Sequence, residues 1–275
     1  MHTELADLPY LSAILWSCLL GLLVILAMPA HRTREIKWVS AAFSGLTLIL
    51  SIYLFAAYDR EAGGLQFVER LEWIPQLGIS YHHGADGFSL PMLLLTGIVF
   101  FTGVLTMWEL EHRVKEFFAL IFLLVAGVFG MFMALDLFFI FVWFDVSLFP
   151  MYLLIAVWGS TRKEYAAMKL TLYLLAGSAL ILPAIVYLVV QSGMGTFDLV
   201  ALSAPGTFGP GVQKFAFFLL YIGFGILAGV WPFHTWSPVG HVAAPTAVSM
   251  IHAGVLMKIG AFGVLRVGMF LCPEG

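Results

Sequence analysis

The sequence FFALIFLLVAGVFGMFMALDLFFIFVWFDVSLFPMYLLIAVW, residues 117–158, decides the fold class. It contains only two charged residues, Asp136 and Asp145, and otherwise consists of two long apolar runs. A bilayer core about 30 Å thick is crossed by about 20 residues of helix, which rise about 1.5 Å each. Lipid offers no partner for an unpaired backbone group, so each run predicts one membrane-spanning helix.

Six further runs have the same length and character. The whole chain is 61% hydrophobic and 11% charged, with a mean hydropathy of +0.99, whereas a soluble domain carries about 25% charged residues. We therefore predict an all-α polytopic membrane protein with about eight transmembrane helices. The predicted spans are residues 8–28, 38–58, 87–108, 117–135, 137–158, 170–190, 212–231 and 242–269.

Composition also excludes several classes of function. The net charge of -3 comes from few charged residues, so no basic face is available to bind nucleic acid. Cys18 and Cys272 are too few for a disulfide framework or a cysteine-bound metal centre. We expect neither a metal site nor a bound cofactor in this chain.

Basic residues alternate between the predicted loops. They cluster after the first, third and fifth spans, and the intervening loops are acidic or nearly uncharged. Cytoplasmic loops carry the excess of Lys and Arg, which predicts an outward-facing N-terminus in a bacterial cytoplasmic membrane, with the long loop 59–86 also outside. The clustered residues are Arg32, Arg34, Lys37, Arg113, Lys115, Arg162, Lys163 and Lys169.

Asp145 is the most informative polar residue, because it lies in the apolar segment FVWFDVSLFP, residues 141–150. It is about 13 Å from the start of its helix, near the bilayer centre. An aspartate there costs about 2.5–3.5 kcal/mol and requires a partner, a proton or a water-filled cavity. Pro150 leaves the carbonyl of Val146 without its helical donor. We interpret Asp145 as a proton or cation site; the alternative is a neutral aspartate that hydrogen-bonds two helices together.

Lys258 lies well inside the last predicted span, too far from either end to reach water easily. The small residues around it, Ala253, Gly254, Gly260 and Ala261, allow close helix packing that would shield the charge from lipid. We predict a buried lysine that exchanges protons. The alternative is a fixed salt-bridge partner of a buried carboxylate.

His234, His241 and His252 surround the join between the seventh and eighth spans, where Pro232, Pro238 and Pro245 interrupt regular helix. Histidine exchanges protons near neutral pH, and transporters place ion sites at helix breaks. All three are therefore candidates for a proton relay. A histidine at a helix end can instead be a simple interfacial hydrogen bonder, and His241 is open to that interpretation.

The remaining polar residues favour structural roles. Lys169 is expected to extend to the cytoplasmic interface and is a secondary candidate for the proton path. Asp136 is expected to cap the helix that follows it, and His82 and His83 are expected in solvent. Tryptophans near the predicted span ends are expected as interfacial anchors: Trp38, Trp73, Trp108, Trp158, Trp231 and Trp236.

The string WPFHTWSPVGHVAAPT, residues 231–246, followed by AGVLMK at 253–258, resembles the antiporter-like subunits of respiratory complex I, most closely the subunit M branch. The resemblance spans about two-thirds of the chain in order. It also includes ADGFSL at 85–90, LDL at 135–137, Phe144-Asp145 with PMY at 150–152, and KLTLYLLAGS at 169–178.

The resemblance implies a half-repeat of five helices with a broken seventh helix, and a second inverted half after it. It places Asp145 at the family's key glutamate of helix five, Lys258 at the lysine of helix eight, and His234 and His241 at the two histidines of the connecting stretch. It divides the chain into residues 1–108, with three helices and the outer loop, and residues 109–275, the half-repeat. Because relatives are about twice as long, the second half-repeat is expected to be missing here, in a fragment or a truncated subunit.

Three positions depart from the family pattern. Asp145 replaces a glutamate, Leu227 replaces the lysine of helix seven, and the acid that usually precedes His241 is missing from SPVGH, residues 237–241. His252 resembles the helix-eight histidine of the related subunit L. A path through the family's lysine position is therefore either rerouted through His252 or broken.

The leading functional hypothesis is a proton-translocating, non-redox membrane subunit of NADH:quinone oxidoreductase, acting within an oxidoreductase of the respiratory chain. The resemblance implies L-like and N-like membrane subunits as partners, with NADH, FMN, iron–sulfur clusters and quinone bound by other subunits. The alternatives are the similar antiporter-like subunit of an Mrp-type Na⁺/H⁺ antiporter, an antiporter-like subunit of a membrane hydrogenase, and a structural subunit that does not pump.

Overall fold

The structure is a computed structural model that describes residues 9–275, and the predicted polytopic α-helical fold is confirmed. It contains eight helices long and apolar enough to cross a membrane within this range. The last span is built from α10 (Thr246–Ile251), a π-helical turn (His252–Leu256), α11 (Met257–Gly263) and a second π-helical turn (Val264–Met269). The other seven are α1 (Tyr10–Ala27), α2 (Thr33–Ala57), α3 (Ser89–Thr106), α4 (Val114–Met133), α5 (Leu137–Trp158), α6 (Lys163–Ser192) and α8 (Pro210–Ala228).

Two predicted helix starts differ most from the structure. α2 begins at Thr33 rather than 38, and α6 begins at Lys163 rather than 170. The first turns of both helices are rich in charge, so hydropathy does not detect them although the backbone is already helical. The predicted start of the first span at residue 8 lies outside the described residues.

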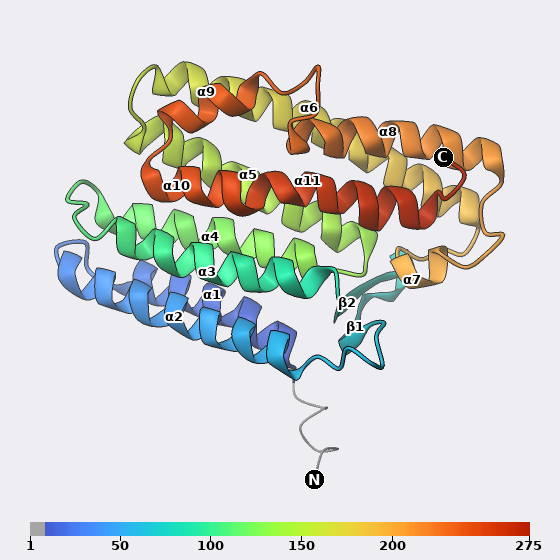
Figure 1. Cartoon of the computed structure of the whole chain (residues 1–275), viewed down its shortest axis with the longest axis horizontal. Helices are drawn as coiled ribbons and strands as arrows, with labels where there is room; N and C mark the ends of the chain where they lie inside the picture. Colours follow the sequence, from blue (N-terminus) through green and yellow to red (C-terminus); the bar gives the residue numbers. More distant parts are fainter. Residues whose placement is uncertain (1–8) are drawn as a thin grey trace, which may run out of the picture.

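The helices pack around α4, which is buried on nearly all sides. It contacts α1, α2, α3, α5 and α11, and α5 in turn packs on α6, which packs on α8. Figure 1 shows α1 and α2 at one edge of the bundle and α6 and α8 toward the other, with the last span crossing between α3 and α8. The last span therefore lies beside the helices that carry the predicted site residues.

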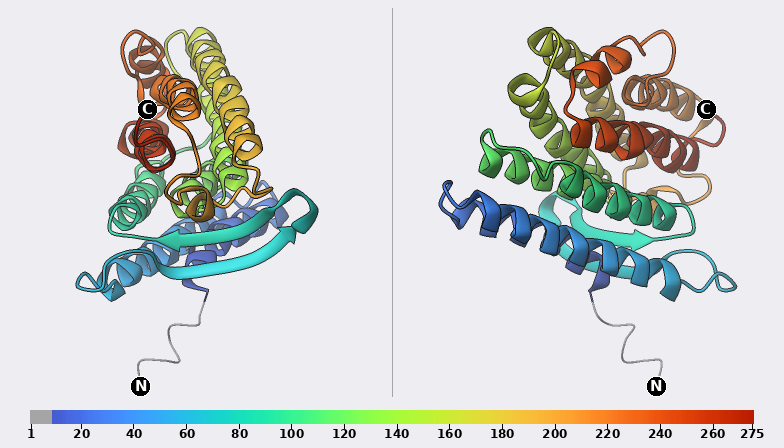
Figure 2. Two further views of the ribbon diagram at one scale, coloured as in Figure 1. Left: turned by 90° about the vertical axis from the view of Figure 1, so that its right-hand side faces the viewer. Right: turned by 60° about the vertical axis from the view of Figure 1, so that its left-hand side comes forward.

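A β-hairpin covers one end of the bundle, where the sequence predicted only a loop. Strands β1 (Gln66–Ile74) and β2 (Ile79–Ala85) pair antiparallel, with a short 3₁₀ turn, Pro75–Leu77, between them. Figure 2 shows that the strands run across the helix ends. Gly78 follows the turn with φ 67°, and a Cβ there would collide with the carbonyl oxygen of Gly195.

Side chains from the hairpin and the connecting loops cap the helix ends. Asp136 accepts hydrogen bonds from the backbone N–H groups of Phe138 (2.9 Å) and Phe139 (3.4 Å), so the predicted cap of α5 is confirmed. Glu69 of β1 accepts from the backbone N–H of Leu11 (2.8 Å) and also from Ser12, which satisfies the N-terminus of α1. Helix termini require such partners, and here a distant strand supplies one of them.

Candidate functional site: ionisable residues within the spans

Asp145 lies on α5, half-buried, and is linked to α6. Its Oδ1 accepts a hydrogen bond of 2.7 Å from the hydroxyl of Ser178, which is itself buried. None of the ion pairs formed by the described residues includes Asp145. The carboxyl group is therefore held by one neutral donor, an arrangement that can accommodate either the protonated or the ionised form.

The chain breaks its seventh helix next to this region. α8 ends at Ala228 because Gly229 adopts φ 73°, and a short helix, α9 (Trp236–Ala243), then packs on α6. Pro245 separates α9 from α10. The predicted interruption is thus present, and it places His241 and His252 on neighbouring elements.

His241 and His252 form a stacked pair. Their ring centroids lie 4.2 Å apart with an interplanar angle of 22°, and Nδ1 of His241 lies 3.0 Å from the hydroxyl of Ser249. His252 is fully buried, and neither of its ring nitrogens has a hydrogen-bond partner among the described residues. The pair joins a partly exposed imidazole to a deeply buried one through contact of their ring faces, with no hydrogen bond between them among the described residues.

Trp236 extends this stack, contrary to the prediction that it anchors at the membrane interface. It is fully buried, its indole stacks on His252 at 5.2 Å, and its Nε1–H donates to the carbonyl of Ile226 (2.9 Å). The break after α8 leaves that carbonyl available. Sequence reasoning missed this role because a tryptophan near a helix end is usually interfacial.

Lys258 is exposed at the surface of the described residues, so no helix of residues 9–275 buries it. It lies on one stripe of the last span with Ala261 and Leu265, both also exposed, while Ile259 and Gly260 face the bundle. Its ammonium group donates to the carbonyl of Ala253. Of the small residues around Lys258, Gly260 packs against the backbone of α8, whereas Ala253 and Ala261 are exposed.

The other candidates lie apart from the stack. His234 is in the connection between α8 and α9, and its buried Nδ1 has no hydrogen-bond partner within residues 9–275. The adjacent Thr235 hydroxyl lies 3.1 Å from that of Tyr173 on α6. Lys169 lies in the second turn of α6, its ammonium 5.9 Å from the ring centre of Tyr165.

Leu227 is fully packed in α8, one residue after the carbonyl that holds Trp236. An apolar side chain therefore occupies the position at which the family resemblance expects a lysine. His252 reaches the same end of α8 through Trp236. His252 therefore lies near position 227. Position 227 itself carries no ionisable group.

Arg266 forms a buried ion pair that sequence reasoning did not predict. Its Nη1 lies 2.6 Å from Oδ2 of Asp86, just before α3, and only 8% of the arginine is exposed. Burial favours a raised pKa at Asp86, but the backbone N–H of Ser89 and the Arg266 charge more than offset it, and the pKa is lowered. The pair ties the C-terminal part of the last span to the start of α3.

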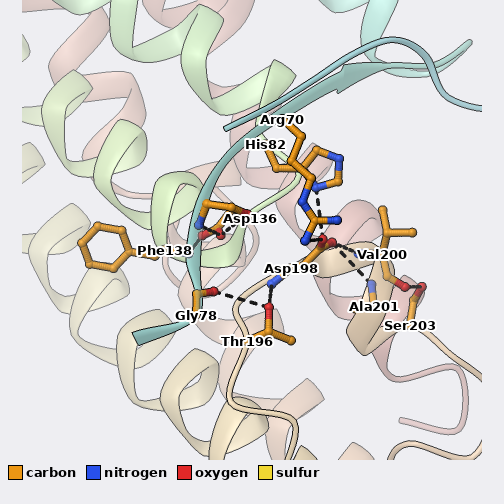
Figure 3. A network of polar contacts seen from close by, with 11 residues as sticks. Arg70, Gly78, His82, Asp136, Phe138, Thr196, Asp198, Val200, Ala201 and Ser203 are labelled. Carbon is orange, nitrogen blue, oxygen red and sulfur yellow. Dashed lines mark hydrogen bonds and ion pairs between the residues drawn. The ribbon is translucent and has the colours of Figure 1, made fainter. Parts of the chain in front are cut away.

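A second polar network lies under the hairpin (Figure 3). Oδ2 of Asp198 lies 3.3 Å from Nη2 of Arg70 and 3.3 Å from Nδ1 of His82, and the backbone N–H of Ser80 donates to Asp136 (2.9 Å). Asp198 also caps the short helix α7 (Leu199–Leu202). Strand β2 is thereby joined to the loops before α5 and α7.

The prediction that His82 and His83 face solvent was wrong, because the hairpin buries both. His83 is 1% exposed, and burial lowers its pKa to about 3. Its ring packs edge-on against Tyr81 at 4.1 Å, and its backbone bridges to Ala134. These histidines help to close the hairpin end of the bundle and are remote from the stacked pair, His241 of α9 and His252 of the last span.

The fold and the buried ionisable residues define a polytopic membrane protein built like an ion transporter. The family model described as "NADH:quinone oxidoreductase/Mrp antiporter, TM" matches residues 134–274. The chain belongs to this family. The match covers α5 through the last span and therefore includes Asp145, Lys258 and all three candidate histidines.

Similar proteins support the same assignment. The chain is 35% identical over 271 residues to NAD(P)H-quinone oxidoreductase chain 4 2 of Microcystis aeruginosa, covering 98% of this chain and 49% of the relative. It is similar to a chain of respiratory complex I from Thermus thermophilus, with a TM-score of 0.84, 27% identity and coverage of 97% and 54%. A chain of the Mrp complex from Dietzia sp. shares the fold, with a TM-score of 0.75, 24% identity and coverage of 96% and 29%. The chain thus spans about half the length of the curated relatives it matches.

Proposed function

We propose that this chain is the proton-translocating part of a non-redox membrane subunit of an NADH:quinone oxidoreductase. The observation that carries the proposal is the presence of two ionisable groups, Asp145 and Lys258, inside spans where neither forms an ion pair with a described residue. A charge in a span costs about 2.5–3.5 kcal/mol, so a fold that keeps two such groups unpaired uses them.

The residues have separable roles in this proposal. Asp145 of α5, which accepts a hydrogen bond from Ser178, binds and releases a proton. The stack of His241 and His252 passes protons between the cytoplasmic side and the buried end of α8, and His234 and Lys169 contribute at its edges. Electron transfer in other subunits, which hold NADH, FMN, iron–sulfur clusters and quinone, changes the electrostatic field and with it the protonation of Asp145 and Lys258.

The exposed stripe of Lys258, Ala261 and Leu265 on the last span indicates where a partner contacts this chain. Because a lysine facing lipid is costly, we propose that a second antiporter half or a neighbouring membrane subunit, L-like or N-like, covers this stripe in the complex. Residues 109–275 then form one half-repeat and residues 1–108 its N-terminal addition. The distribution of basic residues among the loops supports an orientation with the N-terminus and the hairpin on the outer side of the membrane.

A test of the proposal is Lys258→Met, measured in the assembled complex in membrane vesicles. Quinone reduction driven by NADH should continue, while the pH gradient formed per electron should fall at least about fivefold, since a methionine cannot carry a proton. The matched control is Lys214→Met, an exposed lysine near the start of α8. If Lys258→Met pumps as well as this control, the role of Lys258 in the proposal is wrong.

A structural subunit that does not pump is the second candidate, and Leu227 is the observation that favours it. If the proton path requires a lysine at position 227 and is broken there by Leu227, then Leu227→Lys should raise proton translocation severalfold. In the rerouted path through His252, the same variant should give no gain, and His252→Phe should abolish translocation. If Leu227→Lys gives no gain and neither His252→Phe nor Lys258→Met lowers proton translocation by the complex, the subunit does not pump and the structural candidate is favoured.

An Mrp-type Na⁺/H⁺ antiporter subunit remains the rival from another class, because the family includes both kinds of protein. The neighbouring genes distinguish the two. Genes for NADH dehydrogenase subunits on both sides favour the oxidoreductase, and genes for antiporter subunits favour the antiporter. The same comparison applies to a membrane hydrogenase.

A further inference from the structure

A pocket of about 820 Å³ lies between α1, the hairpin and α5, outside the region of the proton path. Its walls are mainly apolar, with Trp16 from α1, Leu71 and Trp73 from β1, and Phe139 from α5. This volume is within the range of about 300–1,000 Å³ that is typical of sites for small molecules. Trp16, Leu71 and Trp73 are all more than half exposed, so the pocket opens on the side of the bundle.

The polar groups of this pocket gather at its outer end. Ser12 and Glu69 hydrogen-bond each other there, and the Ser12 hydroxyl lies 2.8 Å from the Tyr81 hydroxyl. Trp16 lies one turn further along α1, about 6 Å deeper in the membrane at about 1.5 Å per residue. From its outer end inward, the pocket therefore changes from polar to apolar, as a lipid molecule does from its headgroup to its acyl chains.

Arg70 provides a positive charge beside the polar end. One nitrogen of its guanidinium, Nη2, contacts Asp198, while the side chain is 57% exposed and lines the pocket. Guanidinium groups bind phosphate well because they offer several parallel donors. Glu69 also lines the pocket but already accepts hydrogen bonds from the backbone N–H groups of Leu11 and Ser12, so Arg70 is the charged group left for a headgroup phosphate.

We propose that this pocket binds one phospholipid of the outer leaflet, with its phosphate on Arg70 and an acyl chain between Trp16, Trp73 and Phe139. A lipid is the occupant that fits, because the pocket is continuous with the apolar, exposed face of α1 that includes Leu20, Leu23 and Val24. The hairpin thereby holds a lipid at the outer edge of α1. This proposal does not depend on proton translocation.

Native mass spectrometry of the full chain in detergent tests the proposal, with palmitoyl-oleoyl phosphatidylethanolamine as the probe. The wild type should retain one lipid. Ala13→Trp fills the pocket and should reduce the retained lipid about tenfold or more, because the acyl chain loses its space. Leu20→Trp, on the same face of α1 beyond the pocket, should retain it.

A second pair of variants tests the headgroup contact. Arg70→Gln should weaken lipid retention about threefold to tenfold while the fold persists, because His82 and the backbone N–H groups of α7 still hold the buried Asp198. Arg60→Gln, an exposed arginine of the same outer region, should have no effect. Diacylglycerol with the same chains should bind the wild type more weakly than the phospholipid does, and equal binding would contradict the role of Arg70.

The assembled complex separates a lipid from a protein occupant. The phospholipid should remain bound to the complex and should be lost on Ala13→Trp. Equal retention by the wild type and Ala13→Trp contradicts the proposal. So does loss of the lipid on assembly together with cross-linking of Trp73→Cys to a neighbouring subunit, which would identify the pocket as a subunit contact.

Discussion

Arg266 and Asp86 illustrate how single charged residues are stabilised in this protein. Nη1 of the arginine pairs with Asp86, its guanidinium carbon lies 5.6 Å from the ring centre of Phe262, and its Nε and Nη2 have no hydrogen-bond partner within the described part of the chain. A buried charge whose partner is removed is strongly destabilising, because nothing then compensates its desolvation. The carboxylate of Asp86 therefore matters more to stability than an exposed ion pair does.

Replacing Asp86 by asparagine should show this difference. Asp86→Asn keeps an oxygen for the backbone N–H of Ser89 but removes the charge opposite Arg266, and it should lower the free energy of unfolding by about 3–5 kcal/mol. Arg32→Gln breaks the exposed pair with Glu35 and should cost about 0–1 kcal/mol. Unfolding of the purified chain in mixed micelles measures both. Equal losses would show that the buried pair contributes no more than the exposed one.

Sequence reasoning found some site residues and missed others for a consistent physical reason. Asp145 and the capping role of Asp136 follow from local sequence, because each depends on the helix that contains it. Trp236, His83 and Arg266 are buried by segments far away in the chain, which hydropathy along the sequence cannot detect.

The last span owes its position to close contacts between helix backbones. A Cβ at Gly260 would collide with the backbone nitrogen of Ala228 and lie 2.6 Å from the carbonyl oxygen of Phe224, both on α8. Gly177 and Gly223 bring α6 equally close to α8. Small residues let helices approach in a membrane, where packing replaces the hydrophobic effect as the main attraction between them. The elements that carry the proposed proton path are thus held together through glycines.

Gly260→Ala should disturb this packing without changing any ionisable group. The added methyl forces the last span away from α8 and should cost about 1–3 kcal/mol of stability, as overpacking does. Gly211→Ala, near the start of α8 with no atom within 4 Å of its Cβ position, should leave stability unchanged or raise it. Thermal unfolding of the two variants in the same detergent measures the difference. A loss at Gly211 as large as that at Gly260 would contradict the close-contact interpretation.

The spans could be predicted because apolar length alone determines them, but the hairpin could not. β1 lacks the alternation of buried and exposed residues that identifies a half-buried strand, since its residues are mostly exposed. β2 is buried almost throughout by α4 and the loop before α7. Neither strand therefore shows the periodicity of two residues that a sequence search detects.

Across the whole molecule, the stacked histidines and the hairpin network lie toward opposite ends of the spans. Figure 1 places α9 and the start of α10 away from the hairpin, α7 and the C-terminus. Asp145 lies between these ends, about 12 Å from the start of α5. A proton that enters through the histidine pair and leaves toward the hairpin has to pass the level of Asp145, which makes this carboxyl group the central element of the proposed function.

The ratio of protons moved to electrons transferred, measured in vesicles containing the assembled complex with Asp145→Asn or Asp145→Glu, tests that role most directly. Both variants should assemble and oxidise NADH, since the asparagine still accepts a hydrogen bond from Ser178. The ratio should fall markedly in Asp145→Asn and stay near the wild-type value in Asp145→Glu, because only a carboxyl group can bind and release a proton here. A wild-type ratio in Asp145→Asn would contradict the proposed function of Asp145.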